Sequence, residues 1–351
     1  YLATDPDREG EAIAWHLMSD FSEKKLLKDK SIKRISFNEI TSSAIKHAVN
    51  SPREIDQDLV DAYLARRILD HLIGFKVSPL VWRHAPPAKS AGRVQSPSLR
   101  IICERETERD KHIKEEYWPI SSKFAFKDFT FEAELIKSND SDLKKKPVSS
   151  EDQKNKIQSE LKSSEFYIHS IETKPQSSSP NPPFRTSTLQ MTASSSLGFT
   201  ADRTMRSAQN LYEAGLITYL RTDGINISTS PNTGEPFSEE NPGPPPLEEI
   251  RNVISEKFGK KFLSDDVRVY KSKVKNSQEA HEAIRPTNIK TYPEKINLGQ
   301  DEQKLYTLVW NRTVASQMSN SEHERKKIVV HSENDKYCLL YTSPSPRDLL
   351  K

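Results

Sequence analysis

The spacing of apolar and polar positions predicts that the chain opens as part of an α/β unit and continues in helices. Apolar residues recur at helical spacing in four stretches, from the acidic start to about Phe21, Ser42–Val49, Asp56–Ile73 and Val94–Lys111. Two short apolar stretches predict strands, one ending at Ala3 and one at Ile32–Phe37. Strands that alternate with helices over residues 1 to 55 are typical of an α/β unit.

The pattern changes at Tyr117, after which apolar and polar residues alternate. Residues 124 to 135 alternate on both sides of Lys127-Asp128, which predicts a β-hairpin. A Lys- and Ser-rich stretch, Ser138–Ser164, holds one polar helix, and Phe166–Ile171 predicts another strand. The Ser- and Pro-rich stretch Ser177–Pro183 is typical of a linker, so we expect a domain boundary there.

Residues 184 to about 295 are predicted to be mostly helical, with Ser187 as an N-cap and a helix over Ala201–Ala214. The segment Ser228–Pro246 is rich in Pro, Gly, Ser and Asn, which predicts an exposed loop. A long helix, Asp301–Met318, then precedes a return strand, Lys327–His331.

Composition narrows the class of protein. Hydrophobic residues make up 34% and the mean hydropathy is -0.75, which favours several small domains around an open, polar-lined space. The net charge is only +3, from 53 basic and 50 acidic residues, so any path for nucleic acid must come from local basic clusters. Cys103 and Cys338 lack metal-ligand spacing, which indicates a reducing compartment without a disulfide framework. No apolar run of about eighteen residues occurs, so we expect no transmembrane helix, and the start does not resemble a signal peptide.

The segment Gly215–Asp223 places Tyr219 two residues before Arg221 in a stretch that predicts a strand. Side chains alternate along a strand, so Ile217, Tyr219 and Arg221 would share one face. A phenol beside a guanidinium suits attack on a phosphodiester, because tyrosine supplies a nucleophile and arginine binds phosphate oxygens as charge builds on them. The alternative is that Tyr219 is a packing residue with a satisfied hydroxyl group.

Three carboxylates at a spacing of two, Asp5, Asp7 and Glu9, stand where the first strand meets the first helix. Oxygen ligands grouped in this way suit Mg²⁺, which one or two carboxylates usually hold together with water and substrate phosphate. The same residues also make a good helix start, with an Asp N-cap, an early proline and acidic groups at the positive end of the helix dipole.

Five motifs in one order resemble type IA DNA topoisomerases. Asp5-Pro-Asp7-Arg-Glu9-Gly-Glu11 resembles the DxDxE segment of their TOPRIM domain, and Gly215–Asp223 resembles their active-site tyrosine segment. The other three matching stretches are Ala65–Asp70 through Ser90–Ser96, Pro182–Phe184 through Thr186–Gln190, and Ala280–Thr287. The matches run from Tyr1 to about Val330, and five ordered motifs are far more specific than any one of them.

The resemblance implies a multidomain α/β plus α fold, with a partial TOPRIM unit, helical domains and a β-rich hinge arranged around a DNA-sized opening. The expected domains are the C-terminal part of TOPRIM (1–55), a helical DNA-groove domain (56–115), the first part of the hinge (116–183), a helical domain with the active-site tyrosine (184–297), the helix and return strand of the hinge (298–341), and a non-native tail (342–351). Before residue 1 the family carries a further glutamate and a lysine, so the chain is expected to be incomplete. The family usually has a shorter connection where Ser228–Pro246 stands, so the resemblance implies an exposed insertion there.

The resemblance also assigns candidate site residues. Tyr219, Arg221, His281 and Glu9 would be catalytic, and Asp5, Asp7 and Glu9 would hold Mg²⁺. The residues expected to line the DNA path are Arg66, Arg67, His71, Arg83, Ser90, Arg93, Gln95, Ser187, Thr188 and Gln190. By spacing alone, Ser90–Ser96 is as compatible with a glycine turn as with a helix start that binds phosphate. In the same way, the arginine and histidine residues between 66 and 83 are as compatible with a charged helix face in water as with a DNA path.

His281 lies in Glu279-Ala-His281-Glu282, which is not a zinc-protease pattern, and a lone histidine is more often structural. The resemblance favours a place beside the scissile phosphate, whereas Glu279 and Glu282 are expected to serve packing or solubility. No nucleotide-binding P-loop pattern occurs, so ATP-driven chemistry is not indicated.

The function implied is ATP-independent, Mg²⁺-dependent cleavage of one DNA strand through a 5′-phosphotyrosine, strand passage and religation, which relaxes negative supercoils. Relaxation and decatenation are both compatible with these residues. The partners would be single-stranded and negatively supercoiled DNA, without a membrane, and the protein would be a monomer in the cytoplasm with the nucleoid, or in an organelle of a eukaryote. The alternatives are a TOPRIM nuclease or primase, and an inactive DNA-binding fragment.

Overall fold

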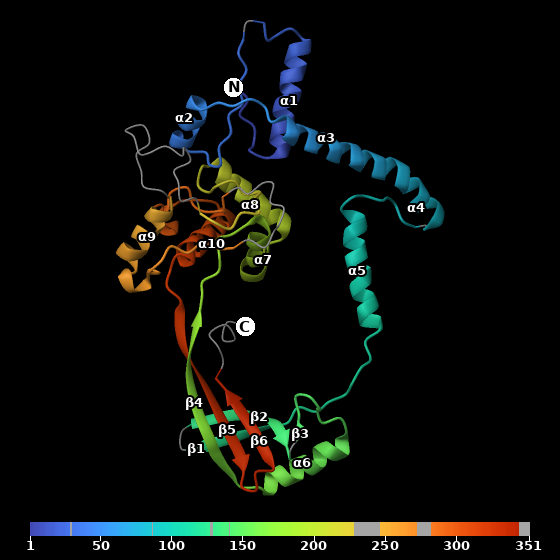
Figure 1. Cartoon of the computed structure of the whole chain (residues 1–351), viewed down its shortest axis with the longest axis vertical. Coiled ribbons are helices and arrows are strands. Elements are labelled where there is room, and N and C mark those ends of the chain that lie inside the picture. Colours follow the sequence, from blue (N-terminus) through green and yellow to red (C-terminus); the bar gives the residue numbers. More distant parts are fainter. Residues whose placement is uncertain are drawn as a thin grey trace. The chain divides into compact units, whose positions relative to one another are not determined.

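The structure is a computed structural model that describes residues 1–28, 30–85, 87–126, 129–139, 141–227, 246–271 and 282–343. It divides into two compact units (Figure 1). The first comprises Tyr1–Ser98 and Ser179–Asn320, and the second comprises Leu99–Ser178 and Ser321–Lys351. The linker predicted from Ser177 onward therefore falls at a boundary between the units. Among the described helices, none combines the length and apolar character needed to cross a lipid bilayer.

The N-terminal part of the first unit contains helices α1 (Arg8–Glu23) and α2 (Ser42–Asn50), both as predicted. The two predicted strands are reduced to isolated bridges, in which Arg34 pairs in parallel with Leu2 and antiparallel with Arg53. The parallel bridge joins the segment before α1 to the segment after it, which is the connection expected of an α/β unit.

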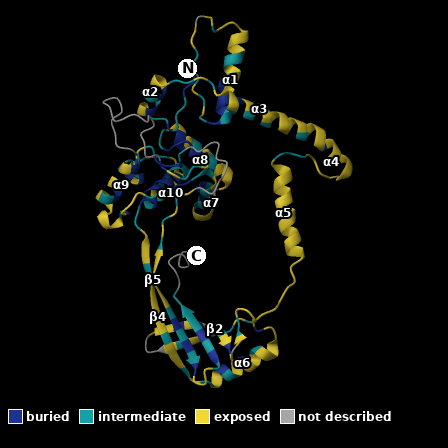
Figure 2. Ribbon diagram, in the orientation of Figure 1, coloured by how far each residue is buried: buried dark blue, intermediate teal, exposed yellow. Residues whose placement is uncertain are grey.

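Three helices follow in the predicted helical groove region. Helix α3 (Gln57–Leu72) begins at the N-cap Asp56, passes through a π-helical turn (η1, Ile73–Val77) and continues directly into α4 (Ser78–His84). Helix α5 (Gln95–Asp110) crosses from the first unit into the second and has no buried residue (Figure 2). The predicted helices Asp56–Ile73 and Val94–Lys111 are confirmed to within a residue or two.

The core of the first unit lies among α7 (Thr186–Leu197), α8 (Ala201–Glu213), α9 (Pro246–Lys257) and α10 (Gln300–Ser316). Figure 2 shows the buried residues gathered in these helices, and they include Leu211, Tyr306, Val309 and Trp310. Helix α10 packs against α7, α8 and α9, so it belongs with the tyrosine-bearing helices. The predicted range 298–341 had grouped this helix with the β-rich hinge instead.

The N-cap prediction for α7 is wrong by two residues. The cap is Arg185, whose backbone N–H donates to Thr188 Oγ1 over 3.1 Å, and Ser187 lies exposed in the first turn. The predicted insertion at 228–246 lies outside the described residues except for Pro246, which starts α9.

The second unit is built on one six-stranded antiparallel sheet with the order β1-β2-β6-β5-β4, and β3 added at β2. The strands are β1 (Ser121–Phe126), β2 (Phe129–Ser138), β3 (Ser141–Asp142), β4 (Phe166–Ser178), β5 (Ser321–Ser332) and β6 (Tyr337–Thr342). Helix α6 (Glu151–Ser163) packs on it through Ile157 and Leu161. The predicted hairpin is confirmed by the pairing of Phe126 with Phe129, whereas β4 and β5 are much longer than predicted.

Candidate active site

The tyrosine segment is not a strand. After α8 the chain turns at Gly215, whose φ is +71°, and only Ile217 forms a bridge, with Pro286. The backbone N–H groups of the next residues are held separately, because Thr218 donates to Arg285 O over 2.9 Å and Tyr219 donates to Asn38 O over 2.7 Å. The predicted strand fails because these acceptors come from separate segments, which cannot form a regular ladder.

The structure nevertheless brings the predicted tyrosine, arginine and acidic motif together. Tyr219 is 2% exposed, and its Oη donates a hydrogen bond to Asp7 Oδ2 over 2.6 Å. Arg221 Nη1 lies 3.8 Å from the same oxygen, with most of the arginine side chain exposed. Tyr219 and Arg221 therefore converge on one carboxylate through the irregular backbone, without the shared strand face that the pattern predicted.

Asp7 has two roles in this arrangement. Its Oδ1 accepts from the N–H of Gly10 over 2.7 Å, so it is the N-cap of α1, as the helix-start interpretation predicted. Its Oδ2 faces Tyr219, so the same carboxylate is also part of the candidate site. The two interpretations of the acidic motif are therefore compatible at this residue.

The electrostatic environment keeps the phenol protonated. The pKa of Tyr219 is raised above its ordinary value by burial, by the hydrogen bond to Asp7 and by the charges of Asp7 and Asp5, and Arg221 opposes this only in part. The neighbouring Tyr212, whose ring centroid lies 5.4 Å away, has its pKa raised to about 12 by burial and by the same two carboxylates. A nucleophilic Tyr219 would therefore have to pass its proton to a base, and Asp7 Oδ2 is in contact with it.

The other two carboxylates of the motif lie apart from this contact. The pKa of Asp5 is raised by partial desolvation of its carboxyl group and by the charge of Asp7, with Arg221 and Arg34 opposing. Glu9 is half-exposed and pairs with Arg66 on α3, with 3.2 Å between Oε1 and Nη1. Within the described ranges, no three His, Cys, Asp or Glu side chains form a ready-made metal cage. Asp5 and Asp7 repel each other, and a hard cation with water and phosphate ligands would relieve that repulsion, so these two residues fit Mg²⁺.

The motifs in the sequence did not predict a buried network of ion pairs around Glu11, the last residue of the acidic motif. Glu11 and Arg34 are both fully buried and pair over 3.0 Å, while Arg53 and the N–H of Asp56 donate to the same carboxylate. Burial alone would raise the pKa of Glu11, but the hydrogen bonds from Arg53, Asp56 and Arg34 outweigh it and bring the pKa to about 2.

Arg34 fixes the backbone that carries the metal-site candidates. Its Nη1 donates to the carbonyls of Leu2 and Thr4, and its Nη2 donates to the carbonyl of Asp5 over 2.7 Å. The same Asp5 carbonyl leaves no room for a Cβ at Gly10, which explains the glycine at that position. The sequence signal was a charged residue, Arg34, inside a predicted strand, where a buried charge must find a partner.

The predicted DNA-path residues occupy two places in the first unit. Arg67, His71 and Arg83 are exposed on α3 and α4. Ser90 is exposed in the loop before α5, and Gln95 is exposed where α5 begins. Arg93 makes a bidentate pair with Asp70, at 2.6 and 3.1 Å. Thr188 and Gln190 are half-buried and Ser187 is exposed, all on α7. His281 and Glu279 lie outside the described residues.

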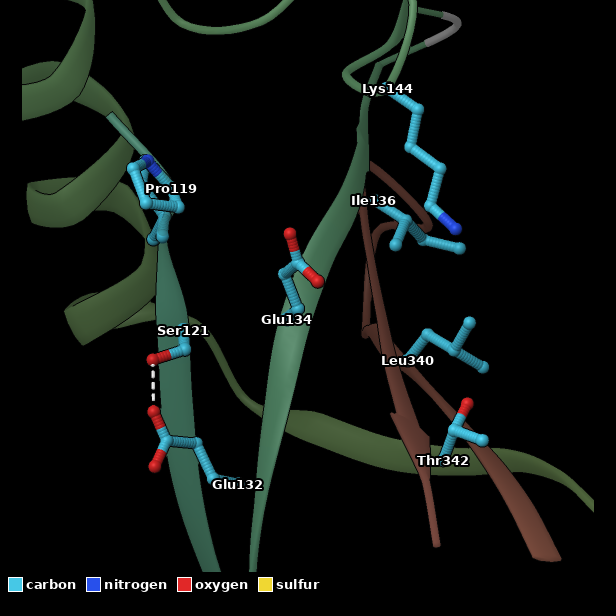
Figure 3. A pocket seen from close by; sticks show the side chains of 9 residues that line it. Pro119, Ser121, Glu132, Glu134, Ile136, Lys144, Leu340 and Thr342 are labelled. Atoms are coloured by element: carbon cyan, nitrogen blue, oxygen red, sulfur yellow. Dashed lines mark hydrogen bonds between the residues drawn. The ribbon is translucent and has the colours of Figure 1, made fainter. Parts of the chain in front are cut away.

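The second unit carries a separate hollow of about 480 Å³ on the sheet between β1, β2 and β6. Figure 3 shows Glu134 and Lys144 on its walls, with Ser121 donating a hydrogen bond to Glu132. None of the predicted site residues lines it. We therefore place the candidate site in the first unit, at Asp7 and Tyr219.

Gly215 gives a first testable consequence of this geometry. Alanine at residue 215 would adopt a left-handed φ, and its Cβ would overlap the carbonyl oxygen of Ile40. We expect Gly215→Ala to lower the free energy of unfolding by about 1–3 kcal/mol, measured by denaturant titration. Gly74→Ala is the matched control, because a Cβ there meets nothing within 4 Å. Equal stability of the two variants would contradict the close approach of Gly215 to Ile40.

The fold and the site define a protein in which a buried tyrosine is hydrogen-bonded to the acidic motif of the N-terminal segment. Comparisons with known proteins identify the family. A family model described as DNA topoisomerase matches residues 54–342, and a Toprim domain model matches residues 1–40. The chain belongs to the bacterial-type, type IA DNA topoisomerase family.

Individual relatives support the assignment. The chain is 47% identical over 349 residues to DNA topoisomerase 1 of Rickettsia bellii, covering 96% of this chain and 42% of that protein. It is 45% identical over 332 residues to DNA topoisomerase 1 of Xylella fastidiosa (strain Temecula1), covering 91% and 39%. The solved structure of full-length topoisomerase I from Thermotoga maritima is similar with a TM-score of 0.73 and 36% identity, covering 97% of this chain and 52% of that one. The chain thus spans less than half the length of these curated relatives.

Proposed function

We propose that this chain carries the DNA cleavage and religation site of a type IA DNA topoisomerase, with Tyr219 as the nucleophile. The observation that carries the proposal is the 2.6 Å hydrogen bond from Tyr219 Oη to Asp7 Oδ2. It joins the tyrosine segment to the TOPRIM acidic motif across more than two hundred residues of sequence. Tyr219 is also buried, so its hydroxyl is held in one place, and a held nucleophile is what covalent catalysis requires.

In the proposed reaction, Tyr219 Oη attacks the phosphorus of a single-stranded DNA backbone and its proton passes to Asp7 Oδ2. The bond from phosphorus to the 3′ oxygen breaks, and that oxygen takes up one proton, which balances the proton that Asp7 accepted from Tyr219, and leaves as a free hydroxyl. The product is a 5′-phosphotyrosine. Arg221, and His281 by resemblance, stabilise the charge on the phosphate oxygens. Religation is the reverse attack, and it needs no ATP because the phosphotyrosine bond keeps the phosphoryl group activated.

Asp5 and Asp7, with Glu9, are the residues proposed to hold Mg²⁺. When bound, the ion would supply positive charge that neutralises the phosphate and orients the leaving hydroxyl for religation. Glu9 also pairs with Arg66, which lies in the middle of α3. In the proposal this pair links the metal site to the DNA path.

The DNA path is proposed to follow the basic residues of α3 and α4, the start of α5, and the polar side chains of α7. Arg66 and Arg93 are held in ion pairs with Glu9 and Asp70, so each guanidinium is oriented before DNA arrives. In the full-length protein, arrangement of the units around a DNA-sized opening would allow the other strand to pass before religation, which relaxes negative supercoils. Such a protein would act as a monomer on chromosomal DNA, in the nucleoid of a bacterium.

The experiment is covalent capture of single-stranded DNA by the chain. An oligonucleotide labelled at its 3′ end is incubated with the protein and Mg²⁺, quenched with denaturant and resolved by denaturing electrophoresis. We expect label to migrate with the protein, while a 5′-labelled oligonucleotide yields a shortened strand with a free 3′ hydroxyl. Cut DNA without an adduct would instead indicate a TOPRIM nuclease, and intact DNA with binding alone would indicate an inactive DNA-binding fragment. Either result would overturn the proposal for this chain.

A further inference from the structure

A second buried charge cluster joins the tyrosine-bearing helices to the N-terminal part of the first unit. Arg285 is 1% exposed and lies four residues after His281 in the sequence. Its Nε and Nη2 donate to the two carboxylate oxygens of Glu282 over 2.5 and 3.0 Å. Its Nη2 also donates to Glu39 Oε2 over 3.3 Å, across more than two hundred residues of sequence. The guanidinium is therefore shared between a carboxylate on its own segment and one on the TOPRIM side.

Glu39 belongs to a short stretch that touches the tyrosine segment repeatedly. The carbonyl of Asn38 accepts the hydrogen bond of the Tyr219 N–H over 2.7 Å. The carbonyl of Ile40 lies against Gly215. Glu39 is 8% exposed, and its other oxygen, Oε1, accepts from Thr41 Oγ1 over 3.0 Å. The ion pair thus lies between two backbone contacts that set the position of Tyr219.

Because Arg285 is shared between Glu282 and Glu39, the contact between Arg285 and Glu39 can open without leaving the arginine unpaired. Burial by itself would lower the pKa of Arg285, but Glu282 and Glu39 more than compensate and raise it, so the cation is well neutralised in the closed arrangement. If the tyrosine segment moves away, Arg285 retains Glu282 and remains paired. Glu39 then returns to water, where a lone carboxylate is stable. A buried pair whose separation left a bare cation would be far harder to break.

We propose that the Glu39–Arg285 ion pair is a latch that docks the tyrosine segment onto the TOPRIM segment and sets how often Tyr219 separates from Asp7. Glu39 and Arg285 are positioning residues, since neither contacts Tyr219 Oη. Glu282 has the opposite part, because it stabilises the released form by keeping Arg285 neutralised. The effect of the latch on DNA cleavage rests on the proposed function, whereas its effect on the separation of the two segments does not.

The test measures hydrogen exchange at the amide of Tyr219, whose acceptor is Asn38 O on the other side of the contact. Glu39→Gln keeps the size and an acceptor but removes the charge. We expect Tyr219 exchange to accelerate about tenfold or more relative to the amide of Tyr306 in α10, which reports the core of the same unit. Tenfold corresponds to about 1.4 kcal/mol of opening free energy.

A second variant makes the test specific. Glu282→Gln removes the partner that Arg285 would keep after opening, so opening should become rarer and Tyr219 exchange should slow relative to Tyr306. A merely structural cluster predicts acceleration in both variants. Asp301→Asn, which breaks the exposed pair with Arg203 at 2.6 Å, is the control and should leave the ratio unchanged.

The possible outcomes separate the two proposals. Opposite shifts in Glu39→Gln and Glu282→Gln support the latch. An unchanged ratio in Glu39→Gln, or acceleration in both variants, overturns it; if Glu39→Gln does not fold, the direction of the shift in Glu282→Gln decides alone. Failure of the wild-type chain to form a covalent adduct would overturn the proposed function but not the latch, because the exchange measurement uses no DNA.

Discussion

Replacement of Tyr219 by phenylalanine is expected to abolish covalent capture of DNA while DNA binding remains. The substitution removes only the hydroxyl that is hydrogen-bonded to Asp7 Oδ2, and the ring keeps its buried place beside Tyr212. Loss of an enzyme nucleophile typically costs roughly 10⁴-fold or more, so the adduct should fall below detection in a denaturing gel. Binding, measured by fluorescence anisotropy of a labelled oligonucleotide, should change little because the basic residues of α3 and α4 are untouched.

The neighbouring tyrosine supplies the matched control. Tyr212 is also buried and also lies near Asp5 and Asp7, but it stands in α8 and makes no hydrogen bond to the acidic motif among the described contacts. Tyr212→Phe should therefore keep most of the covalent capture. Adduct formation by Tyr219→Phe, or its loss in Tyr212→Phe alone, would show that the wrong phenol has been assigned as nucleophile.

Replacement of Glu11 by alanine is expected to have the largest effect on stability. Glu11 is fully buried and neutralises Arg34, which is also fully buried, and it accepts hydrogen bonds from Arg53 and the N–H of Asp56. Removing one partner of a buried pair leaves an uncompensated charge, which costs about 3–5 kcal/mol. Chemical denaturation of both proteins at neutral pH would measure the difference. Asp20→Ala, which removes an exposed pair with Lys24, should cost less than about 1 kcal/mol.

The same carboxylate predicts a pH dependence. The pKa of Glu11 is lowered from 4.5 to about 2 in the folded chain, so the folded state holds the proton less tightly than the unfolded state. Its contribution to stability is therefore complete above pH 4.5 and is lost as the pH falls toward 2. Wild-type protein should lose stability over that window more steeply than Glu11→Gln, which has no proton to bind there. Parallel pH profiles for the two proteins would contradict the network.

Local features of the sequence were sufficient for most helices and for the hairpin. Helices α1, α2, α3, α5, α8 and α10 follow from the spacing of residues close together in the chain, and the structure adds the caps Asp56 and Thr200, which also act within a few residues. The hairpin around residues 127 and 128 follows from alternation for the same reason. The strand predicted at the tyrosine segment is wrong, because an extended segment becomes a strand only when a partner strand pairs with it along its length.

By itself, then, the sequence determined the family and indicated a boundary at the Ser- and Pro-rich linker, since ordered motifs and local composition depend only on residues near one another in the chain. Only the tertiary structure decided that Asp7, rather than Asp5 or Glu9, contacts Tyr219. It also decided that Glu11 is committed to Arg34 and Arg53, and that Arg285 is divided between Glu282 and Glu39. The physical reason is that each of these contacts joins segments far apart in sequence. Burial and hydrogen-bond geometry select one carboxylate among several that look equivalent in the motif.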